Sequence, residues 1–338
     1  MSHGLVVSSL HELDQHHTHA HHPENPSRLV AAWHGLQTAD LGDALYLLEP
    51  RLASRAELEL VHDPHYLDTL ERFCQSGGGN VDADTRASQG SWATACLGVG
   101  AGLQLLDAVE SGIAPAGFAL IRPPGHHALV DGAMGFCLFN NIAIAAKSRT
   151  TRGERVLIVD WDVHHGNGTQ AIFWDDPNVL FVSSQLAGHW PFSGEVSETG
   201  GPGAQGSTIN FPFPEGANGE VFLRAYDTVV AAAVEEFQPD WVLISAGFDS
   251  HRADPLGGLG LSSGDFAAMA KRLMQFAPGR VVLFLEGGYD LDAVAASVGA
   301  TAAALVGETH RGESQTNGGP GATIVAAASQ AHDRARNG

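Results

Sequence analysis

The sequence predicts a single α/β domain built on a parallel sheet with helices on both faces. Short apolar runs of the kind found in buried parallel strands alternate with longer segments of helical periodicity. No linker-like stretch interrupts this alternation before about residue 310. A chain of 338 residues is long enough to bury one large core, so we expect one catalytic domain over residues 1–310 and a Gly- and polar-rich tail over residues 311–338.

The elements are predicted in chain order. The first thirty residues, rich in histidine, are interpreted as a solvated loop, and residues 76–80, 81–90 and 194–207 as further loops. Predicted helices begin at residue 28 and cover residues 56–74 (divided by Pro64), 92–111, 136–146, 220–236, 265–276 and 291–306. Predicted strands cover residues 116–121, 155–160, 178–183, 241–245 and 280–285, and residues 311–321 suggest a frayed end.

Composition excludes several classes of function. The chain has 18 basic and 38 acidic residues, a net charge of −20, which argues against a nucleic-acid or anionic-membrane surface. Three scattered cysteines are too few for a disulfide framework or a thiolate zinc site and fit a reducing cytoplasm. We find no signal peptide and expect no segment long enough to span a membrane.

A cluster of polar side chains follows the predicted strand over residues 155–160. Asp160, Asp162 and His164 recur at a period of two, so an extended chain would point them to one side. Ligands bind outside the carboxyl ends of strands in open α/β sheets, which is where these residues fall. A capped strand end is the simpler alternative.

Other predicted strands end in polar groups that would meet at the same rim. These groups are the pair His126 and His127, the pair Asp249 and Asp254, and Tyr289. Two carboxylates and one imidazole with an open coordination position suit a catalytic zinc or a similar divalent ion. We select Asp162, His164 and Asp254 as the trio.

Four motifs resemble those of the zinc-dependent histone deacetylase family, in the same order and at similar spacing. They are RPPGHHA at 122–128, DWDVHHGNG at 160–168, GFDSHRADP at 247–255 and EGGY at 286–289. The resemblance covers residues 21–306 and is nearest to the class II branch, with its bacterial deacetylase-like amidohydrolases and the related acetylpolyamine amidohydrolases. It implies one arginase/deacetylase-like domain with a central parallel sheet of about eight strands.

The same resemblance assigns catalytic roles. It implies that Asp162, His164 and Asp254 hold one zinc ion, that His127 is the general base and later the acid, and that Tyr289 polarises the acyl carbonyl. Water attack on the amide is thus metal-activated. His126 is implied to be oriented by Asp160. Asn167 stands where other branches carry an aspartate beside the second histidine, so His127 should be a weaker base, as in class II.

Binding roles follow from the resemblance too. It places Gly135 and Phe136 in one wall of an acyl-lysine tunnel and leaves Trp190 or Phe192 for the opposite wall. It implies a structural K⁺ or Na⁺ held by Asp160, Asp162, His164 and Ser183. The remaining assignments are Asp84 as the rim aspartate, Arg28 at an acetate-release channel, and Leu256, Gly287 and Gly288 as substrate-binding residues.

The expected reaction is removal of acetyl or other acyl groups from the ε-amine of lysine in proteins or peptides. Acetylated polyamines or other small acetylated amines are the alternative substrates; polyamine-selective relatives carry a glutamate directly after Asp-Pro, where this chain has Leu256. A non-catalytic acyl-lysine binding protein and a manganese ureohydrolase are less favoured, because Tyr289 and the tandem histidines suit neither. We expect no nucleic-acid or membrane partner, and a homo-oligomer stays an option.

Overall fold

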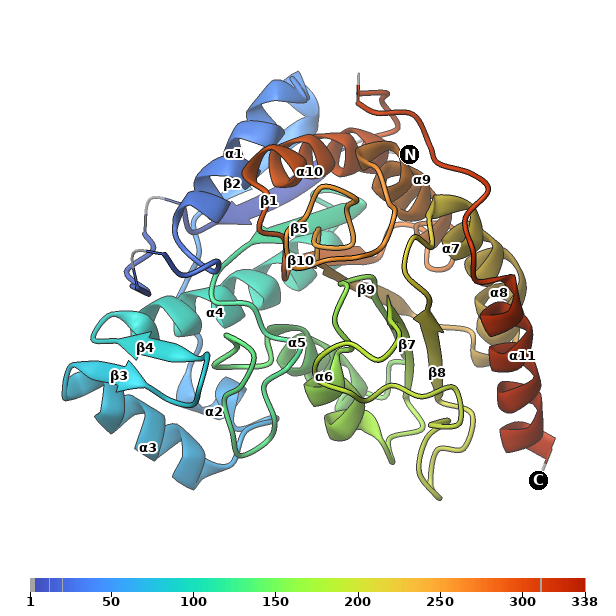
Figure 1. Ribbon diagram of the computed structural model, residues 1–338. Coiled ribbons are helices and arrows are strands. Elements are labelled where there is room, and N and C mark those ends of the chain that lie inside the picture. The colour runs from blue at the N-terminus through green and yellow to red at the C-terminus, as the bar shows by residue number, and fades with distance from the viewer. Residues whose placement is uncertain (1–3, 12, 20, 311, 338) are drawn as a thin grey trace.

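Eight parallel strands form the central sheet of the computed structural model, which describes residues 4–11, 13–19, 21–310 and 312–337 (Figure 1). Their order across the sheet is β2-β1-β5-β10-β9-β6-β7-β8, so the last strand in the sequence lies near the middle. The α/β prediction with about eight parallel strands is confirmed. The strands are β1 (Leu5–Ser9), β2 (Leu45–Leu48), β5 (Ala116–Leu120), β6 (Val156–Asp160), β7 (Val179–Leu186), β8 (Thr208–Phe213), β9 (Trp241–Ala246) and β10 (Val281–Leu285).

Helices cover both faces of this sheet (Figure 1). One layer contains α1 (Ser27–Thr38), α10 (Leu291–Leu305), α9 (Ser263–Leu273) and α7 (Gly219–Ala225), which pack side by side. The other contains α4 (Ser91–Glu110), α5 (Asn141–Thr150) and α6 (Asn167–Phe173). The remaining elements are η1 (Gly42–Ala44), α2 (Arg55–Leu58), α3 (Pro64–Gln75), the hairpin of β3 (Gly78–Asn80) and β4 (Arg86–Ser88), the π-helical turn η2 (Tyr226–Val230), α8 (Ala231–Phe237) and α11 (Ala322–Asn337).

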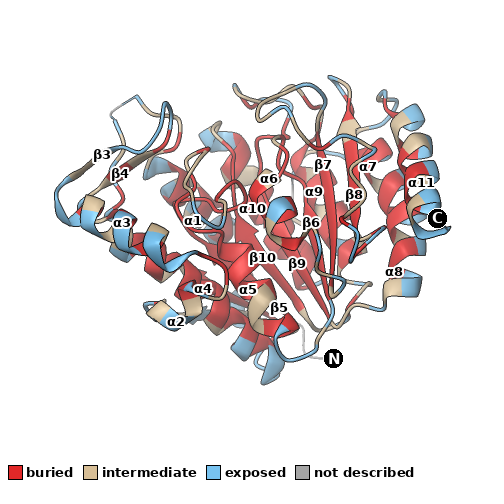
Figure 2. Ribbon diagram, turned by 90° about the horizontal axis from the view of Figure 1, so that it is seen from below, coloured by how far each residue is buried: buried red, intermediate tan, exposed pale blue. Residues whose placement is uncertain are grey.

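The central strands are apolar throughout because both of their faces are covered. Every residue of β5, β6, β9 and β10 is buried, whereas the helices expose their outer faces to solvent (Figure 2). A strand enclosed by helices on two sides has no solvent face, so its sequence shows a continuous apolar run instead of alternation. The polar residues that follow these runs are therefore placed at one rim of the sheet.

Some predicted boundaries were wrong. β1 lies within the first thirty residues, which were interpreted as a loop, and α6 was not predicted. The helix predicted from residue 136 begins at Asn141, because Phe136 has a left-handed backbone (φ 68°) and Asn140 caps the helix by accepting a hydrogen bond from the Ala143 amide at 3.0 Å.

The C-terminal segment is more ordered than the sequence suggests. Residues 322–337 form α11, which packs on β8 and buries Val325 and Ala328. The expectation of a frayed end is thus wrong for this helix, whereas a domain boundary at residue 310 stays a prediction.

Helix α4 also departs from expectation. By length and composition alone it could cross a membrane, but 72% of its apolar window is buried inside the protein. It packs on β1, β5 and β10, so its apolar character is explained by core packing.

Candidate active site

The candidate site lies where β5, β6, β9 and β10 end. β6 is flanked by β7 and β9, and Asp160 at its end is level with Ser183 and Ser245. The segments that leave the four strands carry His126 and His127, Asp162 and His164, Asp249, and Tyr289. As the strands are parallel, their carboxyl ends lie at one rim and bring these side chains together, as expected.

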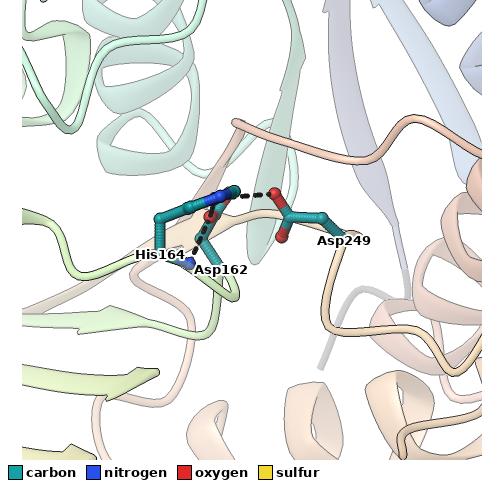
Figure 3. Close-up of side chains that lie close together, drawn as sticks. All are labelled: Asp162, His164 and Asp249. Atoms are coloured by element: carbon teal, nitrogen blue, oxygen red, sulfur yellow. Dashed lines mark hydrogen bonds and ion pairs between the residues drawn. The ribbon is translucent and has the colours of Figure 1, made fainter. Parts of the chain in front are cut away.

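Asp162, His164 and Asp249 form a group whose ligand atoms all lie within 4.8 Å of one another (Figure 3). The Nδ1 atom of His164 lies 3.0 Å from Asp162 Oδ1 and 3.3 Å from Asp249 Oδ2. The loop backbone fixes both carboxylates: Asp162 Oδ2 accepts a hydrogen bond from the Gly287 amide and Asp249 Oδ1 one from the Val163 amide, each at 2.8 Å. Two carboxylates and one imidazole thus converge, the ligand set expected from the sequence.

One member of the predicted trio is wrong. The structure places Asp249, not Asp254, beside Asp162 and His164. Both carboxylate oxygens of Asp254 are occupied by backbone amides: Oδ2 accepts from Tyr289 at 2.6 Å and Asp290 at 3.1 Å, and Oδ1 accepts from Leu256 at 3.0 Å. Asp254 therefore joins the loop after β9 to the loop after β10.

The three side chains of this group shift one another's pKa. Burial, and then the neighbouring Asp162 carboxylate, raise the pKa of Asp249 to about 7. Burial opposes protonation of His164, but Asp162 and Asp249 outweigh it and raise the pKa of the ring to about 10. Asp249 Oδ2 is buried and makes no hydrogen bond within the described chain. This buried carboxylate oxygen has the His164 ring 3.3 Å away and lies beside a second carboxylate, so it is an expected ligand for a bound cation.

The tandem histidines have different partners. His126 Nδ1 lies 2.8 Å from Asp160 Oδ2, and His127 Nδ1 lies 2.7 Å from Asn167 Oδ1. Burial opposes protonation of His126, but Asp160 and Asp162 outweigh it and hold its pKa well above the usual value. Burial, and then the proximity of His126 and His164, hold the pKa of His127 well below the usual value. His126 is therefore expected to be a cation, and His127 a neutral base.

Glu286 and Arg28 organise the loop that carries Tyr289. Glu286 Oε2 accepts hydrogen bonds from the amides of Gly125 at 2.6 Å and His126 at 3.1 Å, so one carboxylate links β10 to the histidine loop. Arg28 donates to the carbonyls of Glu286 and Gly288 and lies 5.0 Å from the centre of the Tyr289 ring. Burial holds the pKa of Tyr289 well above its usual value, so its hydroxyl stays protonated. No role was predicted for Glu286.

Two glycines leave room for the carboxylates. A Cβ atom on Gly247 would lie 2.0 Å from Asp162 Oδ2, and one on Gly287 would lie 2.0 Å from Asp249 Oδ2. Either contact is impossible, so no other residue fits these positions without moving the group. Gly288, with a φ of 117°, permits the turn that follows.

Aromatic rings pack against Tyr289 and His127. Phe136 packs edge-on against Tyr289, with ring centres 6.1 Å apart, and Trp190 packs edge-on against His127 at 4.7 Å. A Cβ atom on Gly135 would lie 2.5 Å from both His127 and Trp190. Phe192 is 76% exposed, whereas the Trp190 ring also lies edge-on to His164, with ring centres 6.0 Å apart.

Two other predicted residues, Asp84 and Leu256, contact neighbouring loops and do not belong to the group of Asp162, His164 and Asp249. The Asp84 carbonyl lies 3.1 Å from His22 Nε2 in an exposed loop, and the His22 ring contacts Phe136. His189, which the sequence did not single out, stacks on His164 with ring centres 5.0 Å apart. His189 Nε2 lies 3.2 Å from the Leu256 carbonyl, which places Leu256 near the site.

Of the predicted structural-cation residues, Asp162 and His164 belong to the site itself, whereas Asp160 and Ser183 lie in the strands β6 and β7. Asp160 and Ser183 are side by side in register and fully buried, and Ser183 Oγ has no hydrogen-bond partner within the described residues. The N-terminal histidines are not a uniformly solvated tract, because His16 is buried and its Nδ1 lies 2.7 Å from Ser91 Oγ.

Comparison with known proteins gives consistent matches. A family model described as "Histone deacetylase domain" matches residues 22–305. "Histone deacetylase 10, chloroplastic" of Oryza sativa subsp. japonica is 38% identical over 315 residues, which is 86% of this chain and 71% of that protein. "Histone deacetylase 9" of Homo sapiens is 38% identical over 321 residues, 85% of this chain but only 32% of that protein. The solved HDA15 HD domain superposes with a TM-score of 0.88 at 33% identity and covers 99% of each chain.

Proposed function

The chain belongs to the histone deacetylase family, and from this premise we propose that it is a zinc-dependent hydrolase that removes acetyl groups from the ε-amine of lysine in peptides or proteins. The observation that carries the proposal is the convergence of Asp162, His164 and Asp249 beside a neutral histidine, His127. Hydrolysis of an amide needs an activated water, a proton acceptor and an oxyanion donor, and the site holds candidates for each.

The residues fit a catalytic zinc ion. Two carboxylates and one imidazole are a typical open-site ligand set, and the buried Asp249 Oδ2, beside the His164 ring, supplies a donor atom. A bound zinc ion would supply Lewis acidity at the acyl oxygen and lower the pKa of the attacking water. The hydrogen bonds from Gly287 and Val163 would hold the carboxylates in place before any ion binds.

His127 is the proposed general base. Its Nδ1–H donates to Asn167 Oδ1, which leaves the Nε2 lone pair to accept a proton from the attacking water. An amide oxygen, unlike a carboxylate, adds no negative charge, so the ring stays neutral until it takes that proton. His127 then passes the proton to the leaving amine.

His126 and Tyr289 are proposed to stabilise charge. His126, paired with Asp160, keeps its proton and faces the carbonyl region as a cation. The protonated Tyr289 hydroxyl is the proposed donor to the oxyanion, because the Asp254 and Arg28 contacts fix its loop. A protein that only binds acyl-lysine would not need His126 and Tyr289 to stabilise charge.

Phe136 and Trp190 are the proposed walls of the acyl-lysine tunnel, and Gly135 leaves room for the Trp190 and His127 rings. We further propose a class II-like enzyme with a structural K⁺ or Na⁺ near Asp160 and Ser183, supported by the unpaired Ser183 hydroxyl. The three cysteines are free and buried, which supports a reducing cytoplasm as its location. A homo-oligomer is proposed as one option for its assembly.

A turnover panel tests the function. Purified enzyme is assayed with acetyl-lysine peptides, longer acyl-lysine peptides and acetylated polyamines, before and after removal of the metal by chelation and readdition of zinc. The proposal requires acetyl-lysine turnover that chelation abolishes and zinc restores. Turnover of none of these amides by the zinc-loaded protein would contradict it.

Acetylated polyamines are the second candidate substrate, favoured by the net charge of −20. Leu256 lies close to the site through its contact with His189, so Leu256→Glu would place a carboxylate near the entrance. We expect this change to raise the ratio of kcat/KM for polyamine over peptide by about tenfold, since a polycation gains an ion pair and a neutral peptide does not. An unmoved ratio would show that Leu256 does not select the substrate.

A further inference from the structure

The loop that leaves β7 reaches the group of Asp162, His164 and Asp249. Its residue His189 stacks on the His164 ring, with ring centres 5.0 Å apart and ring planes inclined by 26°. Stacking at this spacing is favourable for aromatic rings and fixes their relative orientation. His189 follows β7 and His164 follows β6, so the contact joins the segments that leave two neighbouring strands.

The His164 ring is held by hydrogen bonds on one edge only. Its Nδ1 atom faces Asp162 and Asp249, and its Nε2 atom makes no hydrogen bond within the described residues. Histidines that bind a metal are usually oriented by a hydrogen bond from the second ring nitrogen to a carbonyl or a carboxylate. The rings of His189 and Trp190 are the contacts that limit rotation of His164 instead.

A hydrogen bond holds His189 in turn. Its Nε2 atom lies 3.2 Å from the carbonyl oxygen of Leu256, and since a carbonyl only accepts, Nε2 carries the proton. The Leu256 amide donates to Asp254 Oδ1 at 3.0 Å, and Asp254 Oδ2 accepts from the Tyr289 amide at 2.6 Å. His189 therefore belongs to a continuous chain of contacts that runs from His164 to the loop of Tyr289.

The far end of the His189 loop is anchored to buried side chains. Gln185 Nε2 donates to the Gly194 carbonyl at 2.7 Å, and His165 Nδ1 lies 2.8 Å from Ser193 Oγ. A Cβ atom on Gly194 would lie 2.4 Å from Gln185 Nε2 and 2.6 Å from the His165 ring, so only glycine fits where the loop meets these side chains. His189 thus lies in a loop that is fixed at both of its ends.

We propose that His189 is a positioning residue of the site, an inference that rests on the proposed deacetylase function. Its ring holds the His164 imidazole in the orientation that ligates a metal ion. Its Nε2–H links that ring to Leu256 and, through Asp254, to the loop of Tyr289. His189 lies outside the group of three ligands, and its Nε2 atom is engaged with a carbonyl, so its role is exerted through the residues that it contacts.

Two substitutions separate the two contacts of His189. His189→Phe keeps an aromatic ring for stacking but loses the hydrogen bond, and His189→Ala loses both. Zinc affinity is measured by chelator competition with the metal-free chain. We expect it to stay within about threefold of wild type in His189→Phe and to weaken by about 10- to 100-fold in His189→Ala. Hydrogen exchange over residues 254–256 should become faster in both variants.

The loss of the hydrogen bond should also appear in turnover. We expect kcat on an acetyl-lysine peptide to fall by about tenfold in His189→Phe, with KM within about threefold, because the change acts on the placement of Tyr289 and not on substrate binding. The double variant His189→Phe/Asp254→Asn should lose less than the product of the two single losses, since both changes break one chain of contacts. His34→Ala, which removes an exposed histidine from α1, is the matched control.

Three results would overturn the inference. They are zinc binding by His189→Ala as tight as that of wild type, equal weakening of zinc binding in His189→Phe and His189→Ala, and losses of kcat that simply multiply in the double variant. Zinc affinity and hydrogen exchange need no substrate, so they decide the role of His189 even if wild type hydrolyses no amide. That last result would contradict the deacetylase proposal and not the positioning role.

Discussion

Asp249 and Asp254 lie in one loop but have different tasks. Asp249 faces Asp162 and His164, whereas Asp254 accepts hydrogen bonds from three backbone amides. Both follow the same strand, and both are carboxylates, so the sequence offered no physical ground for choosing between them. The choice depends on where the loop turns, which is decided by contacts with the β10 loop that no local pattern contains.

Removing each carboxylate in turn should separate these tasks. We expect wild type to hold about one zinc per chain, Asp249→Asn to lose most of it, and Asp254→Asn to keep it while turnover falls, because the Tyr289 loop loses its anchor. Metal content by elemental analysis and kcat on an acetyl-lysine peptide are the measurements. Loss of zinc in Asp254→Asn with retention in Asp249→Asn would restore the assignment made from the sequence.

Tyr289→Phe removes only the hydroxyl oxygen and leaves the aromatic ring in place. Tyr289→Phe should keep the fold and the zinc but lower kcat by about 10²–10³, the usual effect of deleting one oxyanion donor. Circular dichroism and metal analysis provide the control that the variant is intact. Activity within about threefold of wild type would mean that the ring only packs against Phe136 and Arg28.

At the scale of elements, the sequence predicted the buried strands best. β5, β6, β9 and β10 are continuous apolar runs, and their enclosure on both faces leaves a clear signal. β8 has the sequence TINFPF, which mixes polar and apolar residues, and its position beside β7 is decided by tertiary pairing. Helix α11 follows a Gly-rich stretch and is stabilised by packing on β8, which composition cannot show.

The segment between α10 and α11 fixes an active-site loop. Residues 312–317, here called the C-terminal strap, begin beyond the last residue of the family match. Glu313 of the strap lies 2.7 Å from His251 Nε2, pairs with Arg252 and accepts a hydrogen bond from the Ser263 amide at 3.0 Å. His251 and Arg252 lie between Asp249 and Asp254, so the strap holds the loop that carries both.

Glu313→Gln should therefore loosen that loop. We expect kcat/KM to fall between about threefold and 100-fold, because small displacements of positioned groups are costly, while zinc content is kept. Hydrogen exchange of the amides over residues 249–256 should become faster. Glu308→Gln is the matched control, since its exposed carboxylate makes no hydrogen bond in the described structure. If hydrogen exchange and kcat/KM are unchanged in Glu313→Gln, the C-terminal strap only covers α9 and does not hold the active-site loop.

Over the whole molecule, a buried charge cluster joins the N-terminal segment to the sheet. Glu24 accepts hydrogen bonds from Arg122 Nε at 2.5 Å and Arg28 Nη1 at 3.2 Å, and its Oε2 lies 3.4 Å from His16 Nε2. All four side chains are buried. Burial opposes ionisation of Glu24, but Arg122 outweighs it and holds its pKa well below the ordinary value of 4.5.

Glu24→Gln would leave two buried guanidiniums short of charge, so we expect the free energy of unfolding to fall by about 3–5 kcal/mol. A folded-state pKa below the unfolded value means that the wild-type contribution is present above pH 4.5 and is lost as the pH falls through the lower, folded value. Denaturant unfolding at pH 7 and pH 4 measures both effects. Glu59→Gln, on an exposed pair with Arg55, should cost at most about 0.5 kcal/mol. Equal losses in the two variants would contradict the cluster's importance.

The position of β10 has a consequence for synthesis of the protein. In the sheet it lies between β5 and β9, yet it is the last strand to leave the ribosome. Until residue 285 has emerged, the strands β2-β1-β5 and the strands β9-β6-β7-β8 cannot be joined through β10, so β5 and β9 both lack a neighbour. A nascent chain stalled before that point would expose the edges of both β5 and β9. Insertion of β10 between them completes the eight-stranded sheet.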